Sequence, residues 1–198
     1  MDDRGLAWLD ELARLGEAHD ARETEHRRRK LNITPDTGRL LWILVRAARA
    51  TRILEIGTSN GYSTIWLGDA VQATGGRLET LDVDPARTAL ARAHVARAGL
   101  AAVVDLRTAD AADALRAAPD AAYDLVFLDA ERPAYTGYWP DLARVLAPAG
   151  LLAVDNVLSH AAQLVAFSAL VAADDRVTEA LVPIGAGVLL AVRRPGPA

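Results

Sequence analysis

Polar residues follow two apolar segments in the second half of the chain, and together they have the composition of a metal site. Segment 123–129 ends in Asp129, and segment 150–155 ends in Asp155, which Asn156 follows. If these segments are neighbouring strands of an open α/β sheet, their carboxyl ends converge on one crevice. Two carboxylates and an amide oxygen suit Mg²⁺, Mn²⁺ or Ca²⁺ and disfavour zinc or copper. The alternative is that these residues merely end their strands.

A glycine turn follows an earlier apolar segment and is typical of a site for a nucleotide-like cofactor. Segment 52–57 contains Glu55 and ends in Gly57, and Gly61 follows with Ser59 between the two glycines. Glycine lets the backbone approach a ligand, and the start of the next helix offers unpaired N–H groups. The middle glycine of the dinucleotide fingerprint G-x-G-x-x-G is missing. Glu55 would repel a phosphate but could meet a cationic ligand, although an ordinary turn between a strand and a helix remains the alternative.

Three further acids follow later predicted strands. Asp82 ends segment 77–82, about twenty residues after the glycine turn, where an acid can accept hydrogen bonds from both ribose hydroxyls. Asp84 precedes Pro85 and is predicted to cap a helix. Asp110 could read an adenine amino group or cap the next helix, and both roles can coexist.

The composition limits the class of protein. The chain has 198 residues, 52% of them hydrophobic and 24% charged, which predicts one globular domain. Its net charge of −4 gives no reason to expect nucleic acid as a partner. Cysteine is absent, which excludes disulfides and thiolate chemistry and fits a cytoplasmic protein. The N-terminus lacks the pattern of a signal peptide, and the uncharged stretch 157–173 is too short and polar for a membrane span.

The order of elements predicts an α/β fold, Rossmann-like, with a mostly parallel seven-stranded sheet covered by helices on both faces. An N-terminal helical cap over residues 1–50 should precede a core over 51–194. Strands are predicted at 52–57, 77–82, 103–107, 123–129, 150–155, 177–182 and 187–193. Helices are predicted at 3–30, 35–48, 62–73, 85–98, 110–117, 134–146 and 161–173. The last two strands have no room for a helix between them and should form an antiparallel hairpin.

A basic run, residues 26–30, is predicted to end the first helix. It can be read as a solvated face favoured by the helix dipole, or as a basic rim beside an acidic substrate. Trp8 is expected to pack this helix onto the domain or onto another subunit. Tyr135, Tyr138 and Trp139 either wall a substrate pocket or belong to the core.

The segments together closely resemble the cation-dependent class I O-methyltransferases, the catechol and caffeoyl-CoA O-methyltransferase-like group. The resemblance runs from about Ile33 to Arg194, and it lies in the order and spacing of six segments: 34–41, 54–63, 82–85, 123–130, 155–158 and 181–185. It implies S-adenosylmethionine (SAM) as methyl donor, a catechol-like or phenolic acceptor and a homodimer.

The resemblance also implies roles for residues. Glu55, Gly57 and Ser63 would line the methionine side of SAM, Asp82 would hold the ribose and Asp110 the adenine. The metal ligands would be Asp129, Asp155 and Asn156. The remaining cofactor contacts are expected from the neighbours of these positions: Ser59, Gly61, Tyr62, Val83, Ala111 and Asp129.

Two positions depart from the family pattern. Relatives usually carry a lysine three residues after the first metal aspartate, where this chain has Arg132, which cannot act as a base at neutral pH. Arg132 could instead stabilise a phenolate or bind a substrate carboxylate, and His160 or Glu131 could accept the proton. The second departure is Ala186, which lies between two glycines where relatives often have an acid.

Three other functions remain open at the level of sequence. A nicotinamide-dependent oxidoreductase could use a similar sheet, although the missing middle glycine argues against it. A diverged, non-catalytic SAM-binding protein would explain Arg132 but would have no need of a metal site. A cation-independent methyltransferase would keep full activity in excess chelator.

Overall fold

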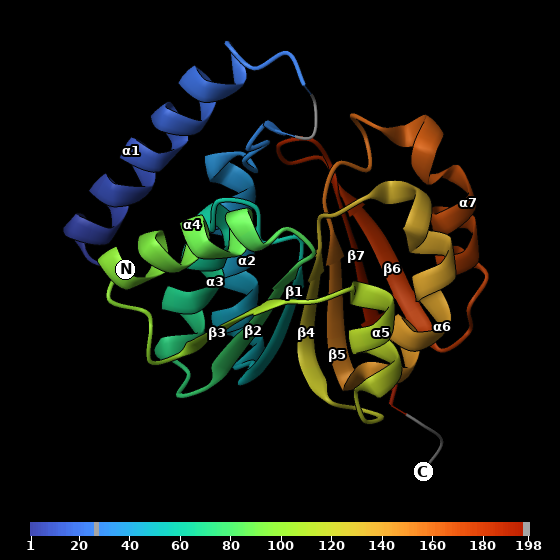
Figure 1. Cartoon of the computed structure of the whole chain (residues 1–198). Coiled ribbons are helices and arrows are strands. Elements are labelled where there is room, and N and C mark those ends of the chain that lie inside the picture. Colours follow the sequence, from blue (N-terminus) through green and yellow to red (C-terminus); the bar gives the residue numbers. More distant parts are fainter. Residues whose placement is uncertain (26–27, 196–198) are drawn as a thin grey trace.

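A central seven-stranded sheet organises the molecule (Figure 1), which is described here from a computed structural model covering residues 1–25 and 28–195. The strand order is β3-β2-β1-β4-β5-β7-β6. Strands β1 to β5 pair in parallel, and β7 runs antiparallel to both β5 and β6. The predicted α/β fold with its C-terminal antiparallel hairpin is therefore confirmed.

Strands and helices alternate along most of the chain. The strands are β1 (Arg52–Ile56), β2 (Arg77–Asp82), β3 (Val104–Thr108), β4 (Tyr123–Leu128), β5 (Leu146–Val154), β6 (Val177–Val182) and β7 (Val188–Arg193). The helices are α1 (Asp3–Asp20), α2 (Pro35–Ala48), α3 (Tyr62–Gln72), α4 (Pro85–Arg97), α5 (Ala111–Ala117), η2 (Arg132–Ala134, a 3₁₀ turn), α6 (Tyr135–Val145) and α7 (Ala161–Ala172).

Helix starts follow the capping signals in the sequence. The Thr34 side chain accepts a hydrogen bond from a backbone N–H at the start of α2, with proline at the first helical position. Asp84 caps α4 in the same way, as predicted. Asp110 accepts two backbone N–H groups at the start of α5, so the capping role that the sequence left open is present.

Two apolar layers enclose the sheet, because the parallel strands bury both of their faces. Helices α1 to α4 lie on one side in Figure 1, and α5, α6 and α7 lie on the other. One hydrophobic cluster joins the first group of helices to the sheet, and a second cluster joins the other group. Trp8 packs α1 onto α4, where its ring meets His94 edge-on and the Arg97 guanidinium lies 3.6 Å from its centroid.

Three predictions about elements were wrong in detail. The first helix was predicted over 3–30, but α1 ends at Asp20, whose carboxylate accepts the backbone N–H groups of Lys30 and Leu31 at 2.6 and 2.8 Å. The chain therefore turns back, and part of the predicted basic end, residues 26–27, lies outside the described residues. Strand β5 begins at Leu146 rather than 150, and the helix before it is correspondingly shorter.

The structure also bears on membrane association. Among the helices of residues 1–25 and 28–195, none has both the length and the apolar character needed to cross a membrane.

Candidate functional site

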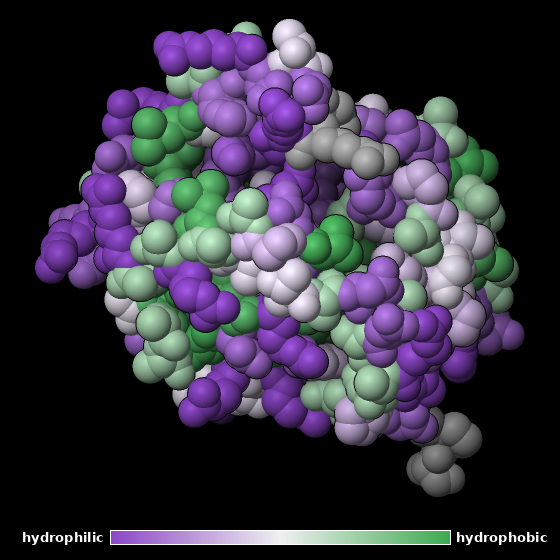
Figure 2. All heavy atoms as spheres, in the orientation of Figure 1, coloured by the Kyte–Doolittle hydropathy of each residue, from purple (hydrophilic) through white to green (hydrophobic). Residues whose placement is uncertain are grey.

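A cavity of about 260 Å³ opens at the carboxyl ends of β1, β2 and β4. Figure 2 shows a hollow at this edge of the molecule with hydrophilic side chains on both sides. The walls come from the glycine turn, the ends of β2 and β4, and the segment that leads into α2. The lining residues are Arg29–Ile33, Ile56–Asn60, Tyr62, Ser63, Leu81–Val83, Arg87, Ala109, Ala111, Asp129–Arg132, Tyr138, Asn156 and His160.

The glycine turn is held against the end of β4. Gly57 has φ +110°, and a Cβ built on it would overlap the carbonyl oxygen of Asp129. Only glycine fits this approach, because any side chain would collide with backbone. Gly61, at φ +86°, precedes α3 and lies against Ala91 of α4. The glycines therefore bring the predicted cofactor turn and the first predicted metal ligand into one cavity.

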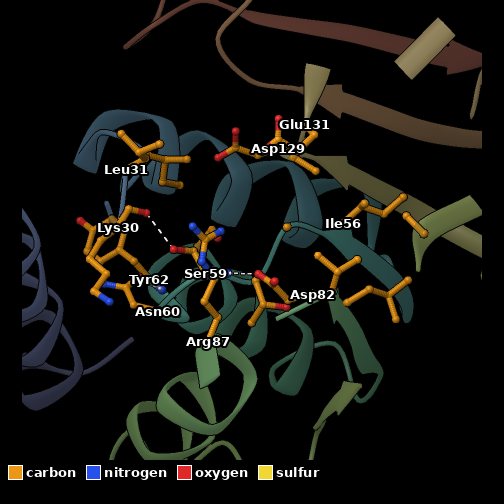
Figure 3. Close-up of a pocket in the computed structure, with 18 of the residues that line it drawn as sticks. Lys30, Leu31, Ile56, Ser59, Asn60, Tyr62, Asp82, Arg87, Asp129 and Glu131 are labelled. Atoms are coloured by element: carbon orange, nitrogen blue, oxygen red, sulfur yellow. Dashed lines mark hydrogen bonds between the residues drawn. The ribbon is translucent and has the colours of Figure 1, made fainter. Parts of the chain in front are cut away.

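Asp82 fixes the conformation of the turn. One of its carboxylate oxygens accepts the backbone N–H of Ser59 at 2.9 Å, and the other accepts the N–H of Asp84 at the same distance. The Ser59 hydroxyl donates to the carbonyl of Lys30 at 2.8 Å, which ties the turn to the segment before α2 (Figure 3). Asp82 lines the cavity at the end of β2, where the sequence predicted it.

Glu55 lies behind the cavity wall instead of lining it. Its carboxylate is fully buried and accepts hydrogen bonds from the hydroxyls of Ser63, Thr64 and Thr80 at 2.5, 2.5 and 2.6 Å. Burial raises the pKa of Glu55 to about 7, although the three hydroxyls favour the ionised form. Ser63 thus lies between Glu55 and the cavity, and its hydroxyl donates to the Glu55 carboxylate.

The three predicted metal ligands are together at the ends of β4 and β5. The Asn156 amide nitrogen donates to Asp129 Oδ1 and to Asp155 Oδ2, both at 3.1 Å. Burial, and then the Asp155 charge, raise the pKa of Asp129, and burial raises that of Asp155. The free energy of such a pair is lowered by any positive group placed between the carboxylates.

These residues fit a divalent cation. Asp155 Oδ1 is buried without a hydrogen-bond partner in the described structure, and a metal ion would satisfy it. The Asn156 side chain already lies between the carboxylates, and rotating its amide by half a turn would present its oxygen. No cluster of three or more His, Cys, Asp or Glu suited to a metal occurs in the described part of the chain, so the set is limited to two carboxylates and one amide.

Arg132 and His160 complete the rim of this cavity. Arg132 Nε donates to Gln163 Oε1 at 2.7 Å, which connects η2 with α7. His160 Nδ1 is 2.9 Å from the Ser159 hydroxyl, and Glu131 lies beside Asp129 in Figure 3. All three candidates for charge stabilisation or proton transfer therefore line the cavity.

Most of the predicted positions line the cavity, but not all of them do. Among the predicted positions, Glu55, Gly61, Asp110 and Asp155 do not line the cavity, whereas the others do. Of the three aromatics, Tyr135 and Trp139 are buried in the core and Tyr138 lines the cavity.

The unpredicted lining residues include Arg87, Thr58, Asn60 and the segment Arg29–Ile33. The basic run was the available signal for that segment, under its reading as a rim beside an acidic substrate. Arg87, in the first turn of α4, carried no signal of its own.

A crevice at the carboxyl ends of parallel strands, with a glycine turn and paired acids, is the arrangement of a cofactor-dependent α/β enzyme. The chain belongs to the O-methyltransferase family, because the family model described as "O-methyltransferase" matches residues 11–194.

Similar proteins carry related names. A catechol O-methyltransferase of Niastella koreensis is 38% identical over 131 residues, covering 65% of this chain and 59% of that protein. The chain thus spans less than two thirds of that relative. A protein of Mycobacterium tuberculosis strain H37Rv, also named as an O-methyltransferase, is 34% identical over 174 residues, covering 81% of this chain and 77% of that protein.

Solved structures agree with the fold. The O-methyltransferase from Bacillus cereus in complex with SAH superposes with a TM-score of 0.79 at 28% identity, covering 95% of this chain and 91% of that one. The O-methyltransferase TomG from Streptomyces achromogenes, in complex with SAM, has a TM-score of 0.79 at 28% identity, with 98% and 91% covered.

Proposed function

We propose that this enzyme transfers a methyl group from SAM to a hydroxyl of a catechol-like or phenolic small molecule, with help from a divalent cation. The observation that carries the proposal is the contact between Gly57 and Asp129. This contact brings the glycine turn against Asp129, which neighbours Asp155 and Asn156, and it supports a common site for donor and acceptor. The bound cofactors of the similar structures and the name of the Niastella koreensis relative support the donor and the acceptor.

The donor half of the cavity is assigned to the turn and the end of β2. Asp82 accepts hydrogen bonds from the ribose hydroxyls, and Asp110, next to Ala111, accepts one from the adenine amino group. The charges of Glu55 and Asp129 attract the sulfonium of SAM, and this attraction weakens when the neutral product forms. The remaining contacts are assigned to Gly57, Ser59, Gly61, Tyr62, Ser63 and Val83.

The acceptor half is assigned to the ends of β4 and β5. Asp129, Asp155 and Asn156 would hold the cation, which when bound lowers the pKa of an acceptor hydroxyl. Arg132 cannot remove the proton of that hydroxyl at neutral pH, because its guanidinium stays protonated. His160 or Glu131 accepts that proton at the cavity mouth.

The donor test is a pair of calorimetric titrations with SAM and with NAD⁺. SAM should bind, and the substitution Asp82→Asn should weaken its binding about tenfold or more, because one ribose acceptor is lost. The matched control is Asp105→Asn on β3, an exposed acid outside the cavity. Binding of NAD⁺ without binding of SAM would favour the oxidoreductase alternative.

The metal test uses thermal unfolding in Mg²⁺ and in EDTA. Mg²⁺ should raise the Tm of the native protein and leave that of the variant Asp155→Asn unchanged, since a ligand that binds only the folded state stabilises it. The same Tm in Mg²⁺ and in EDTA, together with full methyl transfer in EDTA, would favour a cation-independent methyltransferase.

The proposal includes two further expectations, on oligomeric state and on location. The homodimer is supported only by the resemblance, and sedimentation of the purified chain tests it. A cytoplasmic location is favoured by the absence of cysteine, and cell fractionation tests it.

A further inference from the structure

We propose that the acceptor carries a carboxylate, or a comparable anionic group, and that Arg132 binds it. The inference rests on the proposed methyl transfer and adds a class of acceptor and the residue that selects it. Arginine matches this task because its planar guanidinium donates two parallel hydrogen bonds to a carboxylate.

The backbone on both sides of Arg132 is held in one conformation. The hydroxyl of the buried Tyr135 accepts the N–H of Ala130 at 2.6 Å and donates to the carbonyl of the same residue at 3.0 Å. Pro133 restricts the chain directly after Arg132, at the start of η2. The loop between Asp129 and η2 therefore presents Arg132 from a constant position.

The side chain of Arg132 is also oriented before any acceptor arrives. Gln163 of α7 accepts the Nε hydrogen at 2.7 Å, and the hydrogen bonds and ion pairs found within residues 1–25 and 28–195 include none from the two Nη groups. These two Nη groups form the end of the guanidinium that can donate two parallel hydrogen bonds to a carboxylate. Because Gln163 already holds the guanidinium, binding an anion costs less side-chain entropy.

The surrounding charge favours an anion. Arg29 and Lys30 line the same cavity from the segment before α2, and their side chains are partly buried. Three acids line the cavity as well: Asp82, whose carboxylate accepts two backbone N–H groups, Glu131, and Asp129, which accepts from Asn156, is acted on by the Arg132 charge and is assigned to the cation. Arginine at this position, in a cavity with three further cationic residues (Arg29, Lys30 and Arg87), suits an acidic acceptor better than a neutral or cationic one.

The experiment compares two acceptors that differ only in charge, 3,4-dihydroxybenzoate and its methyl ester. The native enzyme should prefer the acid in kcat/KM by about tenfold or more, the effect of one charged two-point contact. In the variant Arg132→Gln this ratio of acid to ester should fall close to one, and in Gln163→Leu it should fall part of the way. The matched control is Arg116→Gln on α5, which removes an exposed arginine outside the cavity and should leave the ratio unchanged.

Calorimetry of both acceptors on the protein loaded with S-adenosylhomocysteine gives the same ratio without turnover. If the native protein methylates neither compound, the proposed function fails for this acceptor class, and the binding ratio still tests Arg132. If both are methylated equally well, or if Arg132→Gln keeps the native preference, the role of Arg132 is wrong while the methyl transfer stands.

Discussion

Replacing Glu55 with glutamine should make the protein more stable at pH 8 and leave its stability nearly unchanged at pH 4. Glu55 is fully buried, and burial raises its pKa from 4.5 to about 7. Between these two values the folded protein holds a proton that the unfolded chain has released. The free energy of unfolding therefore falls as the pH rises through this window, and the full cost is present above about pH 7.

The magnitude follows from the pKa. One pKa unit corresponds to about 1.4 kcal/mol, so the change from 4.5 to about 7 costs on the order of 3 kcal/mol when Glu55 is ionised. Glutamine has the same shape and keeps the polar contacts. Its oxygen can accept from Thr64 and Thr80, and its nitrogen can donate to Ser63.

The assay is urea unfolding of the native protein and of Glu55→Gln across pH 4 to 8, without SAM or metal. The difference between the two curves isolates Glu55 to first order, because the other acids titrate in both proteins. We expect a gap that opens between pH 4.5 and 7 and reaches about 2–3 kcal/mol. A gap that is independent of pH, or a variant that is less stable at pH 8, would refute the reasoning. SAM should bind the variant more weakly, since a charge near the sulfonium is lost.

Other substitutions test the geometry of the site. Gly57→Ala should lower the free energy of unfolding by more than about 2 kcal/mol and abolish SAM binding, because its Cβ would overlap the backbone of Asp129. The control is Gly137→Ala, where an added Cβ meets no other atom; its Tm should stay the same or rise slightly, and its SAM affinity should not change. Tyr135→Phe should cost about 1–2 kcal/mol in urea unfolding and lower kcat, because its hydroxyl holds the loop that follows Asp129; an unchanged kcat would show that the loop needs no such support. Asp155→Asn should raise the Tm in EDTA, since it removes one of two adjacent buried acids, and should abolish turnover; turnover at the native rate would contradict the metal assignment.

The sequence predicted the sheet well because its signals are local. Short apolar strands, caps such as Asp84 before Pro85, and the glycines of the final hairpin each act within a few residues. The closeness of Asp129, Asp155 and Asn156 could also be predicted, because strand ends in a parallel sheet meet at one edge.

What the sequence could not predict depends on contacts between distant residues. The end of α1 is set by Asp20, which accepts backbone groups ten residues further on. The position of Glu55 depends on hydroxyls from α3 and β2, which draw it behind the cavity wall. The hydrogen-bond partner of Arg132 is Gln163 on α7, and no pattern in the sequence predicts this contact.

The most direct test of the central claim is methyl transfer from SAM with a deuterated methyl group to 3,4-dihydroxybenzoate, followed by mass spectrometry of the product. We expect a product that carries the deuterated methyl on a ring oxygen, formed in Mg²⁺, lost in EDTA and restored when Mg²⁺ is returned. SAM binding without any labelled product, from this acceptor or from other catechols and phenols, would contradict the account and favour a SAM-binding protein that has lost catalysis.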